Sequence, residues 1–342
     1  MKSDKRPQTV TMADVADRAG VSRALVSIVF RNVPGASPAT RTKVMQAAEE
    51  LAYRPDQRAR LLGSNRSRTI GVVFGLHHEF HAELVEALYR SVDGTGYDLA
   101  LGASAPTRDE RRAVQSLLGH RCEALILVGP TLARAAIEEL AERLPVVVVA
   151  RAFRRAALDV VRTDDVTGAR LAVEHLSGLG HTSITHVDGR RAPGAAERRR
   201  GYRAAMRELG PASRTGLVPG GLTEDDGERA AAHLLATTPP TAVTAVTAFN
   251  DHCAAGLMAA VRAGGLEVPG DLSVVGYDDS HVAGLAGVAL TTVAQDAPRL
   301  ASAALELAVT RADGASERQK PSEIVVPPRL VVRRTTAPPH PA

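Results

Sequence analysis

The chain is poor in cysteine and aromatic residues: its 342 residues include two cysteines, five tyrosines, five phenylalanines and no tryptophan. Cys122 and Cys253 lie far apart and lack the close pairing found in zinc-binding and disulfide-rich proteins. We therefore expect two reduced thiols and no bound metal.

Long hydrophobic runs are also absent. The longest aliphatic run, residues 144–150, is far shorter than the roughly 18 residues that cross a bilayer. Residues 1–10 are polar and charged, and they lack the apolar stretch of a secretory signal peptide. These absences predict a cytoplasmic protein without a membrane segment.

Common catalytic motifs are missing as well. The sequence has no GxSxG elbow, no P-loop, and no GxGxxG that opens a helix after a first strand. The pairs Gly94-x-Gly96 and Gly178-x-Gly180 are too short a signal, and both precede expected strands. We expect no catalytic residue, no cofactor and no enzymatic activity.

Charge is unevenly distributed along the chain. The formal net charge is +4, but residues 1–68 carry 13 basic and 6 acidic residues, whereas the remainder carries 29 and 32. The length allows two or three domains. A small basic N-terminal segment on a mildly acidic body indicates a head that binds a polyanion.

The first 60 residues have the pattern of three short helices. Thr11 and Asp14 form a capping box for the first helix, and Gly20 supplies a turn with positive φ. Ser22 is a good N-cap for the second helix, and Ser37-Pro38 begins the third. A helix, a turn and a second helix make the helix-turn-helix pattern, whose second helix enters the major groove of DNA.

After Arg68, short aliphatic runs alternate with amphipathic stretches. The expected strands are residues 70–74, 97–101, 124–128, 146–149, 183–187, 243–248 and 273–277. The expected helices are residues 81–93, 108–119, 132–143, 166–178, 195–209, 225–236, 251–263 and 296–310. This alternation predicts parallel sheets covered by helices on both faces, and the number of units favours two similar lobes.

The stretch 11-TMADVADRAGVSRALVSIVF-30 closely resembles the head of the LacI/GalR family of bacterial transcriptional regulators. The resemblance continues over nearly the whole chain, through landmarks such as 69-TIGVVF-74 and 272-LSVVGYDDS-280. It implies an α/β body that is periplasmic-binding-protein-like, with two Rossmann-like lobes, behind a small all-α helix-turn-helix N-terminal domain.

The resemblance also implies a domain organisation. Its parts are a DNA-binding head at 9–55, a hinge helix and linker at 56–68, an effector-binding and dimerisation core at 69–335, and a disordered tail at 336–342. Within the core, the N-lobe takes residues 69–164 and 296–323, and the C-lobe takes residues 165–293 and 324–335.

DNA contacts follow by position from the family. Arg23 is placed to read guanine, Ala24 to touch a thymine methyl, and Ile28 completes the base-reading set. The residues better placed for phosphate contacts are Ser22, Ser27, Arg31, Ser37, Thr40 and Tyr53. The family often has other residues at Ile28 and Arg31, which leaves the operator sequence open. Ser22 and Ser37 can alternatively act only as helix caps.

In the hinge, the resemblance assigns Leu62 to a wedge in the minor groove, with Ala59 beneath it and Arg58 and Arg60 alongside. The alternative is that Leu62 packs on the core domain.

By position, four residues match effector contacts of the family: Arg198, Asn250, Asp278 and Gln295. Phe80 joins the predicted effector contacts because its ring can stack on a sugar. Their side chains suit a polyhydroxylated ligand, because carboxylates, amides and guanidinium groups bond vicinal hydroxyls. Asp278 can alternatively cap the corner between its strand and the next helix. Arg198 can alternatively lie on a solvated face of its helix. Many relatives have Asp or Asn where this chain has Ala150, and the neighbouring Arg151 can serve an acidic ligand.

Three histidines follow the first expected strand. His77 and His81 have the i, i+4 spacing that suits a metal on a helix, but position 82 is alanine, so the run is not HExxH. The place after a strand, at the mouth of the cleft, favours a ligand contact for His77, His78 and His81 over solvent exposure or metal binding.

We expect a homodimeric, ligand-responsive transcription factor, most simply a repressor that binds a pseudo-palindromic operator of double-stranded DNA. A sugar is the favoured effector, with a nucleoside as the alternative. The C-terminus lacks the leucine heptad of tetrameric relatives, so we expect a dimer.

Two other classes of protein are alternatives. A free solute-binding protein would lack the head, and an α/β enzyme would need a nucleophile and base in the cleft. An activator role stays open.

Overall fold

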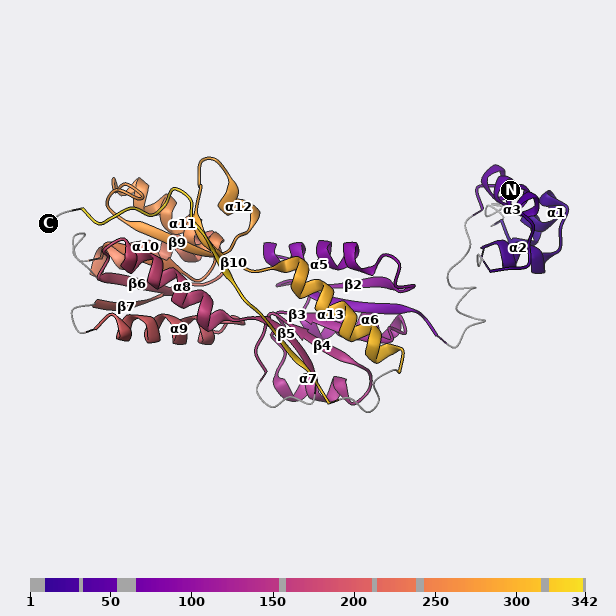
Figure 1. Ribbon diagram of the computed structural model, residues 1–342, viewed down its shortest axis with the longest axis horizontal. Helices are drawn as coiled ribbons and strands as arrows, with labels where there is room; N and C mark the ends of the chain where they lie inside the picture. The colour runs from indigo at the N-terminus through magenta and orange to yellow at the C-terminus, as the bar shows by residue number, and fades with distance from the viewer. Residues whose placement is uncertain are drawn as a thin grey trace, which may run out of the picture. The chain divides into compact units, whose positions relative to one another are not determined.

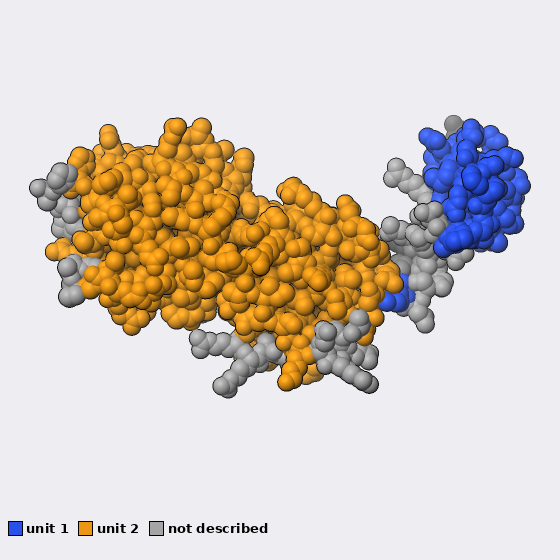
Figure 2. Space-filling model, viewed as in Figure 1, with its two compact units in different colours: residues 1–67 blue, residues 68–342 orange. Residues whose placement is uncertain are grey.

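The chain divides into two compact units, residues 1–67 and residues 68–342 (Figure 2). The computed structural model describes residues 10–30, 33–53, 66–153, 158–210, 214–237, 243–314 and 320–340. The boundary between the units lies at the end of the segment 56–68 that we predict as hinge and linker.

The first unit contains three helices, as the sequence predicts: α1 (Met12–Ala19), α2 (Arg23–Phe30) and α3 (Pro38–Glu50). Thr11 and Asp14 form the expected capping box, and Gly20 ends α1 with a φ of 66°. The Ser37 hydroxyl accepts from the Thr40 amide at 3.2 Å and caps α3. A small buried core holds the helices together: Val15, Ala16, Val26, Val29, Val44, Ala47 and Ala48.

The second unit contains two six-stranded sheets, which form its two lobes (Figure 1). The N-lobe sheet is entirely parallel. Its spatial order is β11 (Glu323–Val326), β5 (Asp159–Thr163), β4 (Val146–Val149), β3 (Ala124–Val128), β1 (Thr69–Gly75) and β2 (Asp98–Ser104). Helices α5 (Glu79–Val92) and α13 (Ala297–Ala312) bury one face of this sheet, and α6 (Glu110–Gly119) and α7 (Arg134–Ala141) bury the other.

The C-lobe sheet repeats this arrangement. Its spatial order is β12 (Arg329–Val331), β10 (Thr291–Ala294), β9 (Ser273–Asp278), β8 (Ala245–Ala248), β6 (Ser183–Asp188) and β7 (Arg214–Pro219), with only β12 antiparallel. Helices α8 (Asp165–Gly178) and α9 (Ala195–Glu208) cover one face, and α10 (Glu224–Thr237) and α11 (Asp251–Ala263) cover the other. The short helix α12 (His281–Gly284) follows β9.

The chain passes between the sheets after β5, after β10 and after β11, and Figure 1 shows the last two crossings in gold and yellow. Three connections therefore join the lobes. Both cysteines are free thiols, with Cys253 buried in the C-lobe core.

Two predicted boundaries are wrong. We predict residues 324–335 in the C-lobe, but Ile324 to Val326 pair with β5 and extend the N-lobe sheet, because the edge of β5 offers unpaired backbone groups. We also predict disorder from residue 336, but the Ala337 amide donates to Ser273 at 3.0 Å, and Thr336 bonds His175 at 3.0 Å. The first residues of this tail therefore belong to the C-lobe.

Candidate functional site

The first candidate site is the exposed start of α2 in the first unit. Arg23 and Ala24 are exposed on its first turn, and the Ser22 hydroxyl accepts from the Leu25 amide at 3.3 Å. Ile28 is half-buried, and Gly35 lies beside it. Two of the three predicted base-reading side chains therefore extend from one exposed helix terminus, whereas Ile28 contributes partly to local packing.

The predicted phosphate contacts divide into three groups. Ser22, Ser37 and Thr40 are occupied with helix capping, so capping is one of their roles. Tyr53 is half-buried, with its ring centroid 5.6 Å from that of Phe30. Ser27 is half-buried as well. Arg31 and the hinge residues Arg58, Ala59, Arg60 and Leu62 lie outside the described residues.

The second candidate site is a cavity of about 380 Å³ between the two lobes of the second unit. Its walls include strand-end loops of both sheets, since His78 and Gly129 come from the N-lobe, and Gly189 and Gly220 from the C-lobe. All five predicted effector contacts line this cavity: Phe80, Arg198, Asn250, Asp278 and Gln295. The volume suits a small molecule.

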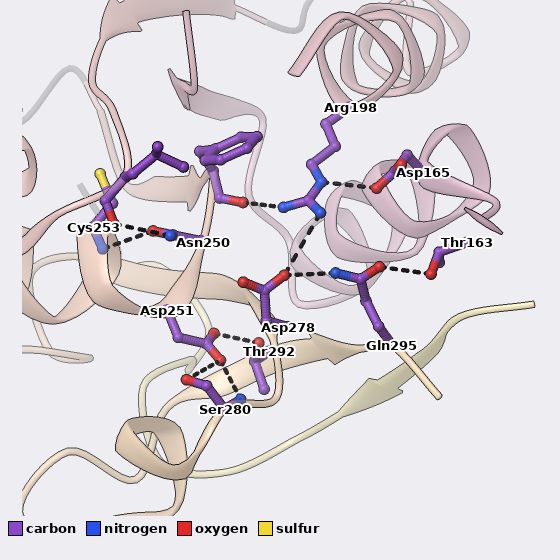
Figure 3. Close-up of polar contacts among 12 residues, drawn as sticks. Thr163, Asp165, Arg198, Asn250, Asp251, Cys253, Asp278, Ser280, Thr292 and Gln295 are labelled. Atoms are coloured by element: carbon purple, nitrogen blue, oxygen red, sulfur yellow. Dashed lines mark hydrogen bonds and ion pairs between the residues drawn. The ribbon is translucent and has the colours of Figure 1, made fainter. Parts of the chain in front are cut away.

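Arg198 is the most heavily bonded of these side chains (Figure 3). Its Nε donates to Asp165 at 2.8 Å, one terminal nitrogen donates to the Phe249 carbonyl at 2.6 Å, and the other lies 3.6 Å from Asp278. Its guanidinium carbon also lies 3.5 Å from the ring centroid of Tyr277. Burial alone lowers the pKa of Arg198, but the nearby carboxylates raise it above its ordinary value, so the group stays charged. The solvated alternative for Arg198 is therefore wrong.

Asp278 and Gln295 connect the lobes. The Gln295 amide donates to Asp278 at 2.8 Å, and its carbonyl oxygen accepts from Thr163 of the N-lobe at 2.6 Å. Burial raises the pKa of Asp278 to about 6, although Arg198 and Gln295 act in the opposite direction. The backbone of Asp278 has a φ of 113°, in a region that disfavours side chains. The corner of β9 is therefore held in a strained conformation at the cavity wall.

Asp251 supports that corner, and we did not predict this residue. It is completely buried, and it accepts from the Ser280 amide at 2.8 Å and from the Thr292 hydroxyl at 2.5 Å (Figure 3). Its neighbour Asn250 caps α11 by accepting from the Cys253 amide at 2.9 Å and also donates to the Leu222 carbonyl. Asn250 therefore has one remaining amide N–H for a ligand.

The histidines do not form a metal site. Helix α5 begins at Glu79, so His77 and His81 are not one helical turn apart. His81 accepts from the Gly75 amide at 3.1 Å, and burial lowers its pKa to about 3, which keeps it neutral. Among the described residues, no group of three or more acidic, histidine or cysteine side chains is arranged to hold a metal ion. All three histidines line the cavity, so a ligand contact stays the prediction for them.

A fourth histidine makes a contact between lobes that the sequence did not indicate. His252 of α11 lies 2.9 Å from Glu79 of α5 and 2.5 Å from Glu224 of α10. Burial alone lowers the pKa of His252, but the two carboxylates raise it above its ordinary value. This contact, the His252 bridge, joins the N-lobe to the C-lobe at the cavity wall.

Arg151 does not serve the cavity. Its guanidinium donates to the carbonyls of Pro130 and Leu132, at 2.6 and 3.0 Å, and it is absent from the cavity lining. The suggestion that Arg151 binds an acidic ligand is therefore wrong. Ala150, which precedes it, does line the cavity and leaves that wall without a polar side chain at this position.

Two family models match the chain. The model of bacterial regulatory proteins of the lacI family matches residues 11–56, and that of the periplasmic binding protein-like domain matches residues 173–336. The HTH-type transcriptional regulator GalR of Escherichia coli is 36% identical over 308 residues, which is 89% of each chain.

Solved structures show the same similarity. A LacI transcriptional regulator from a Rhodococcus species is 45% identical, with a TM-score of 0.75 over 79% of this chain and 98% of its own. The lac repressor dimer bound to operator and the anti-inducer ONPF is 28% identical, with a TM-score of 0.80 over 96% and 100%. The transcriptional regulator CelR in complex with cellobiose is 28% identical, with a TM-score of 0.70 over 96% and 100%. Among the described helices, none has the length and hydropathy of a membrane span.

Proposed function

This chain belongs to the LacI family of bacterial regulatory proteins, which are DNA-binding transcriptional regulators, and we propose that a polyhydroxylated molecule in the cleft controls its affinity for an operator. One observation carries this proposal: five polar or aromatic side chains, three from strand ends and two from the first turns of α5 and α9, line a single cavity between the lobes. The complexes of CelR with cellobiose and of the lac repressor with operator support the two binding roles.

The head binds the operator through α2. Arg23 reads guanine with two hydrogen bonds, and Ala24 contacts a thymine methyl, because both are exposed on the first turn of the helix. Ile28 lies further along the helix and contributes an apolar contact at the edge of the interface. The phosphate contacts are Ser22, Ser27, Arg31, Ser37, Thr40 and Tyr53.

The hinge supplies the second part of the DNA interface. Leu62 enters the minor groove, Ala59 lies beneath it, and Arg58 and Arg60 contact the neighbouring backbone. This assignment rests on the family resemblance, because these residues lie outside the described part of the chain.

The ligand acts by changing the angle between the lobes. The contacts that join the lobes beside the cavity include the Gln295–Thr163 hydrogen bond and the His252 bridge. A ligand that bonds Arg198 and Asp278 on one wall and Phe80 on the other favours one lobe angle over the alternatives. The lobe angle in turn changes the affinity of the head for the operator. The size of this change is the coupling free energy between the two sites.

The protein acts as a cytoplasmic homodimer on a pseudo-palindromic operator, as a repressor and without enzymatic activity. Two-fold symmetry of the protein matches two-fold symmetry of the DNA, which places one α2 in each half-site. The sugar class of effector follows from the hydroxyl-bonding side chains of the cavity and from the cellobiose of the similar CelR complex.

A genome-wide pull-down of DNA bound by the protein tests this function. We expect enrichment of a few pseudo-palindromic sites, and the genes beside them indicate candidate sugars. Repeating the pull-down with those sugars changes the recovery of the same sites. Recovery of DNA without sequence preference would contradict the operator-binding role. Unchanged recovery with every sugar that binds the cavity would contradict control by the effector.

A further inference from the structure

The two loops at the switch points of the sheets carry cationic and imidazole side chains. In the N-lobe, β1 lies between β2 and β3, and in the C-lobe, β6 lies between β7 and β8. Ligands of open α/β sheets bind at the carboxyl ends of strands where the order reverses in this way. His77 and His78 follow β1, Arg190 and Arg191 follow β6, and all four line the cavity.

The acidic side chains of the cavity lining already have cationic partners. Glu79 is bonded to His252 in the His252 bridge. Asp226 accepts from the Leu222 amide at 2.9 Å and forms an ion pair with Arg229. Asp278, the third acidic residue of the lining, accepts from Gln295 at 2.8 Å and lies near Arg198. The negative charge of the lining is therefore compensated within the protein.

Arg190 and Arg191 have no such compensation. Both are exposed at the edge of the cavity, and within the described chain neither forms an ion pair with a carboxylate. Asp188, which precedes their loop, is paired with Arg199 instead. The cavity therefore has uncompensated positive charge on the loop that follows β6.

Arg190 is also held in place rather than left to move in solvent. Its backbone has a φ of 56°, in the left-handed region, and its Nε donates to the Gly220 carbonyl at 2.7 Å. This bond fixes the guanidinium across the loops that follow β6 and β7, and its terminal nitrogens have no hydrogen bond to another described residue. A guanidinium group in a fixed position is suited to bidentate recognition of a carboxylate or phosphate.

We propose that the effector is an anionic polyhydroxylated molecule whose carboxylate or phosphate group binds Arg190 and Arg191. The inference rests on the proposed sensor function and specifies the chemical class of its ligand. The hydroxyl groups of the same molecule bond Arg198, Asn250 and Asp278 deeper in the cavity. His77 and His78, on the facing loop, donate further hydrogen bonds to the anion.

Inorganic phosphate is the first probe of this anion site. We expect phosphate to raise the melting temperature of the full chain, because binding to the folded state stabilises it. Arg190→Gln and Arg191→Gln each weaken phosphate binding about tenfold, the loss expected for a charge-assisted hydrogen bond. The matched control is Arg262→Gln on α11, which removes an exposed arginine outside the cavity and keeps wild-type phosphate affinity. Equal phosphate affinity in wild type and Arg190→Gln would overturn the proposal.

Matched sugars then separate the two sources of negative charge. Calorimetry compares glucose with glucuronate and glucose 6-phosphate, and galactose with galacturonate and galactose 6-phosphate. We expect one anionic member to bind about tenfold more tightly than its neutral parent, and Arg190→Gln to abolish that preference. Tighter binding of the hexuronate identifies a carboxylate, and tighter binding of the hexose phosphate identifies a phosphate.

The outcomes distinguish this inference from the proposed function. A neutral sugar that binds more tightly than both of its anionic derivatives and changes operator recovery would overturn the anionic effector but leave the sensor function intact. An anionic sugar that binds through Arg190 without changing operator recovery would confirm the site and contradict the sensor function.

Discussion

Among single residues, Arg198 joins three separate segments of the C-lobe at the cavity wall. Its guanidinium bonds Asp165 of α8 and the carbonyl of Phe249, which follows β8, and it lies beside Asp278 at the end of β9. The residue is only 6% exposed, so each of these contacts is shielded from water. A buried ion pair of this kind contributes little net stability when intact, but the loss of one partner leaves an uncompensated charge.

We expect Arg198→Met to destabilise the second unit by about 3 kcal/mol, because Asp165 is then buried without its partner. Urea denaturation followed by circular dichroism measures this loss. The double variant Arg198→Met with Asp165→Leu recovers most of it, since the unpaired carboxylate is gone. A single variant with wild-type stability would show that the buried pair does not matter.

His252 gives the cleft a pH dependence. Its pKa is raised by Glu224 and Glu79, so the His252 bridge contributes stability below the ordinary histidine pKa and loses it as the pH rises through the raised value. Between pH 6 and pH 9, we expect wild type to lose more stability than His252→Gln. The difference is about 1 kcal/mol or less, because Glu224 is half-exposed and solvent screens its charge. Burial raises the pKa of Glu83 to about 7. Ionisation of this carboxyl therefore lowers the stability of both proteins as the pH rises. Identical pH profiles of the two proteins would contradict the bridge.

The sequence predicted the site residues that lie at strand ends better than Asp251 and His252, which support the site from a helix. Asn250, Asp278 and Gln295 each follow an aliphatic run, and the carboxyl ends of parallel strands meet at one edge, so their convergence could be expected. Asp251 and His252 lie on a helix, and their partners come from segments distant in the sequence. No local pattern indicates such contacts.

At the scale of elements, α2 is the part of the head that we propose to read sequence. Its inner face is buried through Val26 and Val29, so the exposed first turn has a fixed orientation within the first unit. Arg23→Ala removes the bidentate contact to guanine and weakens operator binding by about 1–3 kcal/mol, with little change in binding to unrelated DNA. Fluorescence anisotropy with operator and scrambled duplexes measures both. An equal loss for both duplexes would indicate a phosphate contact instead.

The hinge makes a second prediction at this scale. Leu62→Ala removes the apolar wedge and lowers operator affinity about tenfold or more, because bending of the duplex is no longer offset by the inserted side chain. Leu61→Ala, the neighbouring substitution of the same size, is the matched control and keeps most of the affinity. Unchanged operator binding by Leu62→Ala would place the leucine elsewhere, as in the alternative that it packs on the core.

Central elements were easier to predict than edge elements. The buried runs of β3 and β4 and the helix α11 match the predicted bounds, because a strand buried on both faces reads as continuous aliphatic sequence. Strand β7 was missed, since it lies at a sheet edge and only Val218 is buried. Strands β5, β10, β11 and β12 were also missed. Unlike β3 and β4, each of them includes polar residues, so none reads as a continuous aliphatic run.

For the whole molecule, the unequal charge of the chain corresponds to its division into two units. The basic residues 1–68 cover the first unit and its linker, and the mildly acidic remainder forms the two-lobed second unit. We expect a homodimer because each half of a pseudo-palindromic operator needs one head. Sedimentation velocity should give twice the chain mass of 36.0 kDa. A monomer or tetramer at micromolar concentration would contradict this assembly.

The most direct test of the account is an operator titration at several salt concentrations, with and without the effector. The operator comes from the pull-down, and the effector is the sugar that changes its recovery. We predict that log affinity falls steeply with log salt, because each head displaces counterions from several phosphates, and that the effector changes the affinity at least about tenfold. A flat salt dependence, or an affinity unchanged by an effector that occupies the cleft, would contradict the coupling between the head and the cavity.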